Sequence, residues 1–421
     1  MPHHLMNNSS AGQKRVWIVN HYAQTRNDTG GLTRHYDFAS HFEDHGWKAT
    51  VIAATTLHPS GRNRRPMQLW PRLETIDQVE FLWVPSTPYS GNGLFRVLNM
   101  SVFFLMLMLP WATRRVPRPD VVVGSSPHPL SAAAGALLAK RYGVPFVYEV
   151  RDLWPEALIN MGRISKDGWV AKLMLRLERW LYANATSVIG LWPLLSKYSD
   201  AIGFDTLRTD WISNGVDPTR FKAEPKTSQT DRFTVMYFGA HGGANDLSNV
   251  VKAMAIVGKS ADGVGISLRL IGDGPNKPGL IALARELGSE NISFEPSVKK
   301  GAIPEIAAEA DAFVFNLVDA EMFRFGISPN KLFEYMAAAR PVLFSCNAAS
   351  NPIAESKGGL SIPANNPAAL AEAIIELAKS SPRERALMGA AARRYVEDNF
   401  QIAYLAHRFT TCLDRAAARP V

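Results

Sequence analysis

Cysteine is nearly absent from this sequence of 421 residues, which excludes a fold held together by disulfide bonds. The two cysteines, Cys346 and Cys412, stand at no C-x-x-C or metal-ligand spacing. We therefore expect no zinc site, no other catalytic metal ion and no cofactor. Such sparse use of cysteine is typical of a reducing, cytosolic compartment.

Two kinds of apolar segment are also missing. Residues 1–14 are polar and lack the apolar region of a secretory signal, so we interpret them as a disordered leader. The longest apolar stretch, 97–112, is interrupted by Asn99 and Ser101 and is shorter than the roughly 20 residues that span a bilayer. An aromatic and basic flank follows it, made of Trp111, Arg114, Arg115 and Arg118. Residues 97–118 fit either a helix lying in a membrane interface or a core helix with a basic end.

Charge is moderately unbalanced, with 46 Lys and Arg against 38 Asp and Glu and a formal net charge of +8. This balance suits an anionic partner, which could be a nucleic acid, an acidic lipid surface or a phosphorylated substrate, or it only keeps the surface soluble. The hydrophobic content of 47% is enough for sizeable cores, and the length predicts two or three domains.

Short β-branched runs alternate with amphipathic stretches twice along the chain. In the first half we expect strands at 16–20, 50–53, 80–84, 120–124, 145–150 and 187–190, with helices that include 32–44, 132–142 and 170–182. The pattern restarts with strands at 233–239, 266–272, 291–294, 311–316 and 341–345, and helices at 247–257, 278–287, 302–310 and 330–339. This alternation is typical of βαβ units in a parallel sheet.

The restart predicts an α/β protein of two Rossmann-like, doubly wound domains that face each other across a cleft. After the leader, we assign residues 15–213 to the first domain and 214–397 to the second. A polar linker lies at 222–231. Residues 398–421 are expected to form a C-terminal helix that packs back on the first domain.

Three glycine-rich turns follow expected strands and precede helices. Gly30-Gly31 comes after the first strand, Gly242-Gly243 with His241 after the first strand of the second domain, and Gly272-Asp273 after the next one. Glycines let backbone amides approach a ligand closely, and a helix N-terminus favours negative charge. We interpret these turns as contacts for a diphosphate, although each fits an ordinary tight turn and His241 fits an exposed loop residue.

The segment 328–334 combines several groups that suit a nucleotide. Ser328 or Asn330 can cap the helix that begins there, leaving amides to point at an anion. Lys331 in the first turn opposes the helix dipole unless an anion neutralises it. Glu334 shares the face of Asn330 and Lys331, where a carboxylate can take both ribose hydroxyls. The alternative is a surface ion pair between Lys331 and Glu334.

Charged residues also follow the strand 145–150. Arg151, Asp152 and Glu156 surround a tryptophan, and the carboxyl end of a parallel strand is where ligands bind in open α/β sheets. We predict that Asp152 orients the acceptor or the sugar, with Arg151 and Glu156 as secondary candidates. The alternative is an Arg-Asp pair that only holds a loop in place.

Together these residues resemble the family-4 retaining glycosyltransferases with the GT-B fold, over nearly the whole chain from Val16 to about Phe400. The most specific part is Ser-Pro-Asn-Lys-Leu-Phe-Glu-Tyr-Met-Ala at 328–337, followed by Arg-Pro-Val at 340–342. Arg-Asp-Leu-Trp-Pro-Glu at 151–156 is similar to the branch that builds bacterial surface polysaccharides, and Asn-Gly-Val-Asp at 214–217 is similar to the family's interdomain motif.

The resemblance implies a first domain for the acceptor and a second for the nucleotide. It implies that a sugar, for instance an N-acetylated amino or deoxy sugar, moves with retention from a nucleotide diphosphate to a glycan or polyprenyl-linked acceptor. No metal and no nucleic acid are implied. The protein would be cytoplasmic or peripheral on the inner face of the plasma membrane, through 97–118. A nucleotide-sugar 2-epimerase and a non-catalytic sugar-nucleotide-binding protein are the alternatives.

Three positions depart from the family pattern. The first of the family's two glutamates falls on Gly326, which has no carboxylate, and Ala240 stands in place of a usual arginine. The usual His-Asp pair reads Arg151-Asp152. We therefore expect Lys331 to supply the missing positive charge and to carry catalysis together with Asp152.

Overall fold

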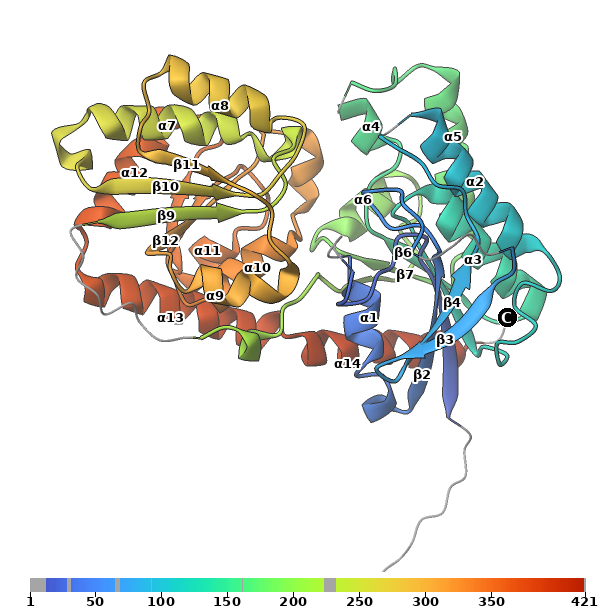
Figure 1. Ribbon diagram of the computed structural model, residues 1–421. Coiled ribbons are helices and arrows are strands. Elements are labelled where there is room, and N and C mark those ends of the chain that lie inside the picture. The colour runs from blue at the N-terminus through green and yellow to red at the C-terminus, as the bar shows by residue number, and fades with distance from the viewer. Residues whose placement is uncertain are drawn as a thin grey trace, which may run out of the picture.

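The computed structural model describes residues 13–28, 32–64, 69–91, 93–160, 162–222 and 232–419. These residues form two α/β domains that lie side by side, and the red C-terminal helices run beneath both of them (Figure 1). The two doubly wound domains predicted from the sequence are confirmed. The expected leader and linker fall mostly on 1–12 and 223–231, outside the described residues.

The first domain contains an eight-stranded sheet in the order β3-β4-β2-β1-β5-β6-β7-β8. All neighbours pair in parallel except β3 and β4, which are antiparallel. The strands are β1 (Lys14–Val19), β2 (Trp47–Ala54), β3 (Arg72–Ile76), β4 (Val79–Val84), β5 (Val121–Ser125), β6 (Phe146–Val150), β7 (Ser187–Gly190) and β8 (Thr209–Trp211).

Helices cover both faces of this sheet because alternate strand residues point in opposite directions. Trp17 and Val19 pack in one core with α2 (Leu94–Met108), α3 (Pro129–Tyr142), α5 (Trp169–Asn184) and α6 (Leu195–Ala201). Val16 and Ile18 pack in another core with α1 (Arg34–Ala39) and α14 (Ile402–Ala417). The last helix of the chain thus completes the core of the first domain.

The second domain contains a six-stranded parallel sheet in the order β11-β10-β9-β12-β13-β14. The strands are β9 (Phe233–Phe238), β10 (Ile266–Ile271), β11 (Ile292–Glu295), β12 (Ala312–Asn316), β13 (Val342–Ser345) and β14 (Gly359–Ile362). One face packs on α9 (Ile303–Ala307), α10 (Asn330–Ala337), α11 (Pro352–Ser356) and α13 (Pro382–Asn399). The other packs on α7 (Leu247–Lys259), α8 (Lys277–Glu286) and α12 (Pro367–Lys379).

The chain crosses between the domains twice, and the two crossings pair with each other. The Val216 amide donates to the Phe400 carbonyl at 3.0 Å, and the Ile402 amide donates to the Val216 carbonyl at 3.1 Å. Beyond this bridge α14 continues onto the first domain, where Asp414 pairs with Lys14 at 2.6 Å. The crossing lies below the space between the two sheets (Figure 1).

The main differences from the prediction are three additional strands, a longer β2 and two shorter helices. The strands β3, β8 and β14 were not predicted, because β3 is a polar edge strand and the other two are short. The helix expected at 32–44 ends at Ala39, with a separate 3-10 turn at Glu43–His45 that stops at Gly46 in the left-handed conformation. The helix expected at 302–310 is only one turn and a half, Ile303–Ala307.

Candidate active site

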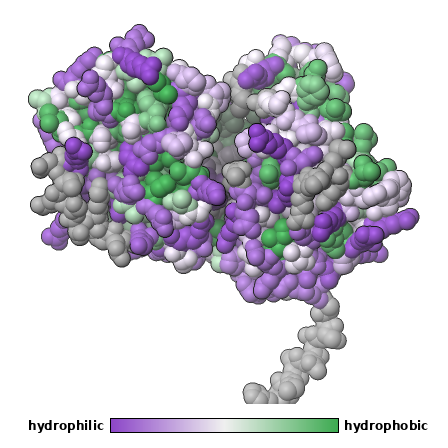
Figure 2. Space-filling model, in the orientation of Figure 1, coloured by the Kyte–Doolittle hydropathy of each residue, from purple (hydrophilic) through white to green (hydrophobic). Residues whose placement is uncertain are grey.

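The carboxyl ends of both sheets face the space between the domains, where the surface is hollowed (Figure 2). A small cavity between the domains takes its walls from both of them and from the C-terminal crossing. It is lined by Thr33, Arg34, Asp37, Phe38, Asn214, Gly215, Lys300, Asn330 and Ile402. Ligands of open α/β sheets bind at such strand ends, so this cleft is the candidate active site.

The loop after β9 is shaped to approach a ligand. Gly242 and Gly243 have open space where a Cβ would be, and Ala240 beside them is exposed. Gly272 after β10 has φ +151° and a Cβ there would lie 1.9 Å from the Gly239 carbonyl oxygen, so no other residue fits. The turn that Gly272 and exposed Asp273 form is thereby packed directly against the β9 loop, and the Asp273 carbonyl accepts the His241 amide at 2.8 Å.

His241 lies inside this loop and not on its surface. Its side chain is fully buried, and neither ring nitrogen has a hydrogen-bond partner among the described residues. Burial and the neighbouring Lys277 hold the pKa of His241 below its ordinary value. The alternative of an exposed loop histidine is therefore wrong, and a buried ring with two unused nitrogens suits a polar ligand.

Lys331 extends from α10 to the same loop. Its Nζ donates to the Tyr237 hydroxyl at 3.0 Å and to the Asn245 side chain, and it lies 4.6 Å from the Tyr237 ring centroid. Among the described residues it has no carboxylate partner, and burial lowers its pKa to about 7. A half-buried ammonium whose partners among the described residues are neutral is placed to receive an anion.

The start of α10 differs from the prediction that Ser328 or Asn330 caps it. The N-cap position is Pro329, and no side chain caps the helix. The Ser328 hydroxyl instead accepts the Asn214 amide at 2.8 Å and contacts Ser213 Oγ at 3.0 Å. Ser328 therefore ties α10 to the interdomain segment, and Asn330, which begins the helix, lines the cavity.

Glu334 pairs with a lysine of another element. Its carboxylate is 3.9 Å from Lys300 Nζ, and Lys300 also donates to Thr33 Oγ1 of the first domain at 3.3 Å. Burial raises the pKa of Glu334, while Lys300 and Arg220 oppose that rise. The surface ion pair between Lys331 and Glu334 is not formed, because Lys331 bonds to Tyr237 and Asn245 while Glu334 lies beside Lys300.

The packing around Gly326 explains why this position does not hold the glutamate that the family resemblance leads one to expect. Its φ is +110°, and a Cβ would lie 2.5 Å from Cδ of Pro193 in the first domain. The Leu194 amide also donates to the Phe325 carbonyl at 3.1 Å. The domains touch so closely here that no side chain fits at position 326.

The acids that follow β6 separate in space. Asp152 is half-buried; burial raises its pKa, and Arg151 and Arg96 lie close enough to oppose the rise. The Arg151 amide donates to Ser126 Oγ at 3.2 Å. Glu156 begins α4 (Glu156–Asn160) near the buried pair of Glu178 and Tyr198. Asp152 thus interacts with Arg151 and Arg96, whereas Glu156 interacts with Glu178 and Tyr198.

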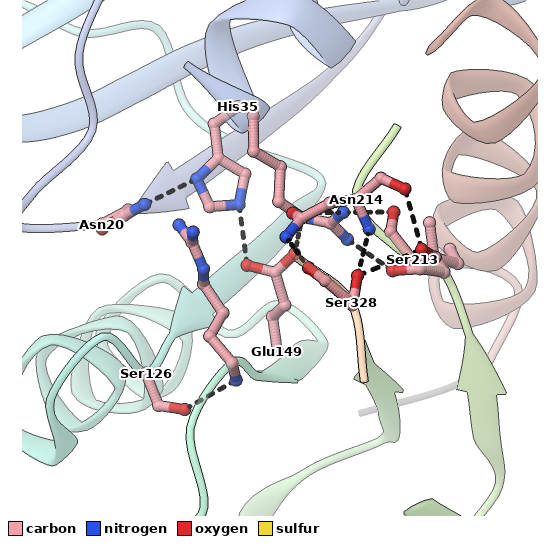
Figure 3. A network of polar contacts seen from close by, with 10 residues as sticks. Asn20, His35, Ser126, Glu149, Ser213, Asn214 and Ser328 are labelled. Atoms are coloured by element: carbon pink, nitrogen blue, oxygen red, sulfur yellow. Dashed lines mark hydrogen bonds and ion pairs between the residues drawn. The ribbon is translucent and has the colours of Figure 1, made fainter. Parts of the chain in front are cut away.

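The remaining predicted residues, Gly30 and Gly31, lie outside the described part of the chain. Directly after them the structure shows a network that the sequence did not single out (Figure 3). Arg34 and His35 bind the two oxygens of Glu149 at 2.9 and 2.7 Å. Figure 3 shows Glu149 lying between His35 and the pair formed by Asn214 and Ser328. The sequence signal that could have identified these residues is their position: Arg34 and His35 follow the Gly30-Gly31 turn, and Glu149 precedes Arg151 by two residues.

Two family models match this chain in succession. The model described as "Glycosyl transferase 4-like domain" matches residues 29–215, and "Glycosyl transferases group 1" matches 232–380. The chain is 23% identical over 320 residues to the putative colanic acid biosynthesis glycosyl transferase WcaI of Escherichia coli K12, covering 72% of this chain and 76% of WcaI. It is 23% identical over 334 residues to the probable glycosyltransferase WbjE of Pseudomonas aeruginosa, covering 77% and 80%.

The solved structure of HepE from Anabaena, in complex with UDP and glucose, superposes with a TM-score of 0.66 at 15% identity, over 96% of this chain and 100% of HepE. That likeness shows the two-domain fold. With the two family models in chain order, the protein belongs to the GT-B glycosyltransferases, a 4-like domain followed by a group 1 domain.

Proposed function

We propose that this glycosyltransferase moves a sugar from a nucleotide diphosphate to a glycan or polyprenyl-linked acceptor during synthesis of a bacterial surface polysaccharide. The observation that carries the donor assignment is Lys331, a half-buried ammonium without a carboxylate partner among the described residues, beside the open β9 loop and the uncapped start of α10. These three features together suit the two phosphates of a nucleotide-sugar.

The proposed reaction retains the configuration at the anomeric carbon. The bond between that carbon and the diphosphate oxygen breaks, and the acceptor hydroxyl oxygen bonds to the carbon from the same face. The hydroxyl proton passes to the leaving phosphate oxygen. Lys331, His241 and the amides near Gly242, Gly243 and Asn330 stabilise the charge that develops on the diphosphate.

The remaining groups are assigned to the ribose and to the acceptor side. Glu334 accepts hydrogen bonds from the ribose hydroxyls, and Asp152 with Arg151 orients the acceptor or the sugar. The name of WcaI, a putative colanic acid biosynthesis glycosyl transferase, supports the pathway class, and that of WbjE supports glycosyl transfer. HepE supports UDP among the candidate nucleotides because its structure was solved in complex with UDP and glucose.

A screen of donors tests the assignment. UDP-, GDP- and dTDP-sugars are compared by thermal shift, where a ligand at 100 times its Kd adds about 2.7 kcal/mol of stability. The stabilising donor is then incubated with and without acceptors. A new glycoside formed only with acceptor supports transfer, whereas epimerised donor formed without acceptor identifies a 2-epimerase. A protein that no nucleotide-sugar stabilises contradicts the proposed function.

The membrane contact predicted through 97–118 is proposed on the surface of the first domain. We define the outer apolar patch as the exposed residues Leu69, Trp70, Leu94, Phe95, Val97, Leu98, Leu105, Trp111, Trp169 and Leu173. Figure 2 shows hydrophobic residues gathered on the side of the first domain where α2 and α5 lie in Figure 1. Residues 81–148 contain six Lys and Arg and a single acid, Asp120. This excess of positive charge complements anionic lipid. Within the described residues no helix has the length and apolarity to cross a bilayer.

Vesicle flotation tests this surface. The protein is expected to float with phosphatidylglycerol vesicles at low salt and to stay behind with phosphatidylcholine. Phe95→Asp with Leu98→Asp should lower the partition coefficient at least about tenfold, because two apolar side chains no longer enter the interface. Val264→Asp is the matched control, since Val264 is 84% exposed on the second domain. Equal binding of both variants, or no flotation of the native chain, would contradict the proposal.

A further inference from the structure

We propose that Arg34 is a positioning residue that sets the donor segment 326–331 in register with the Arg151-Asp152 site. The proposal rests on the proposed function, because it concerns how the donor side and the acceptor side of that site are aligned. Arg34 itself is buried, being 7% exposed, and acts through the groups that it holds.

The guanidinium of Arg34 donates hydrogen bonds both to β6 and to the interdomain segment. Nε donates to Glu149 Oε1 at 2.9 Å, within the first domain. The terminal nitrogens donate to the carbonyl of Ile212 at 2.8 Å and to that of Ser213, with Asn214 Oδ1 at 3.4 Å. Arginine presents five donors in a rigid plane, so a single side chain fixes the β6 strand and the interdomain segment against each other.

The interdomain segment passes this constraint to the donor side. Asn214 Nδ2 donates to the Ser328 carbonyl at 2.6 Å, and the Asn214 amide donates to Ser328 Oγ at 2.8 Å. Figure 3 shows Asn214 and Ser213 closing around Ser328. Since Ser328 precedes the uncapped start of α10 by two residues, its position decides where Asn330 and Lys331 lie.

Glu149 passes the same constraint to the acceptor side. It is fully buried in β6, one residue before the strand ends, and Arg151 and Asp152 follow directly. His35 holds its second oxygen at 2.7 Å. Because both carboxylate oxygens are bound, the end of β6 has one orientation, and the loop carrying Asp152 starts from it.

The residue before Arg34 makes a parallel connection. Thr33 Oγ1 accepts from Lys300 at 3.3 Å, and Lys300 lies 3.9 Å from the Glu334 carboxylate. The start of α1 therefore contacts the donor side at two points, one next to the expected ribose carboxylate and one next to the expected phosphate-binding helix start. A displacement of α1 would move both relative to Asp152.

The test compares Arg34→Lys with Arg340→Lys. Arg340 is a matched control, because it is 6% exposed and donates to backbone carbonyls, including Ala310 at 2.9 Å, within the second domain. Arg34→Lys should lower kcat on the order of 10²-fold, as expected for misplaced reacting groups, while donor KM changes less than about threefold. Arg340→Lys should affect stability and leave kcat within about threefold.

Asn214→Ala tests the same connection independently, so the proposal can still be tested if Arg34→Lys does not fold. It removes the bond to the Ser328 carbonyl and should lower kcat about tenfold. The double variant should lose no more than Arg34→Lys alone, because both residues act through Ser328. Hydrogen exchange of amides 326–334 should rise in both variants and stay unchanged in Arg340→Lys.

The outcomes separate the two proposals. A native protein that transfers no sugar from any nucleotide-sugar contradicts the proposed function. A native protein that does transfer sugar, with Arg34→Lys and Asn214→Ala no slower than Arg340→Lys or with exchange at 326–334 unchanged, overturns the role of Arg34.

Discussion

Lys331→Ala is expected to lower kcat/KM by about 10²–10³-fold, the usual loss when one donor to a developing negative charge is removed. The loss should be large here because Gly326 and Ala240 stand at positions where the family has a carboxylate and an arginine. Lys331 reaches the β9 loop beside Ala240, where its Nζ donates to Tyr237 and Asn245. Steady-state kinetics with the donor found by the screen measure the effect.

Lys331→Met separates lost catalysis from lost folding. Burial lowers the pKa of Lys331 to about 7, below its value in the unfolded chain, so the unfolded chain binds more protons between those two values. The resulting penalty on folding grows as pH falls through that range and is complete below about pH 7. A neutral methionine should therefore be at least as stable as the native residue, although inactive. A change in kcat/KM under threefold in a folded variant would rule out the role of Lys331.

Donor affinity should depend on pH through the same lysine. A bound diphosphate raises the pKa of Lys331, so binding takes up a proton above about pH 7 and weakens as pH rises. Between pH 7 and 8.5 the Kd of the nucleotide-sugar should increase on the order of tenfold. Calorimetry in buffers of different ionisation enthalpy detects the proton uptake. Lys331→Arg, which stays charged, should bind independently of pH in this range.

The fold was largely predictable because its signals are local. Runs such as 233–238 are buried on both faces and read as continuous β-branched and aromatic segments, while glycines mark the turns that follow. The strands β3, β8 and β14 were missed for the opposite reason. They lie at or near sheet edges, where polar residues are tolerated and the hydrophobic pattern fades.

The sequence indicated candidate residues for the site, but it did not indicate which residues they would pair with. A strand end, a glycine turn and a helix start predicted Asp152, His241 and Lys331, respectively, as residues of one cleft. That Lys331 bonds to Asn245, 86 residues away in sequence, and that Arg34 bonds to Glu149, 115 residues away, depends on tertiary packing that no spacing encodes. Ser328 was expected to cap α10 because a serine often does so locally, but the amide and side chain of Asn214 offer it tertiary partners instead.

Asp152→Asn is expected to lower kcat by at least about 10³-fold while the donor Kd stays within threefold. Asp152 belongs to the first domain and stands among Arg151 and Arg96, apart from Lys331 and Glu334 of the donor side. Its carboxylate is therefore placed to orient the acceptor hydroxyl or the transferred sugar, contacts that matter for reaction and little for nucleotide binding. An amide keeps the shape of this side chain and removes its charge.

Glu156→Gln is the matched control, since Glu156 follows in the same segment but lies toward Glu178 and Tyr198. It should leave kcat within about threefold, because the groups that Glu156 interacts with, Glu178 and Tyr198, are not those around Asp152. Calorimetry with the donor completes the comparison. If Asp152→Asn abolishes nucleotide binding, the carboxylate belongs to the donor site; if both variants lose the same activity, the loop as a whole is required and neither acid has a separate role.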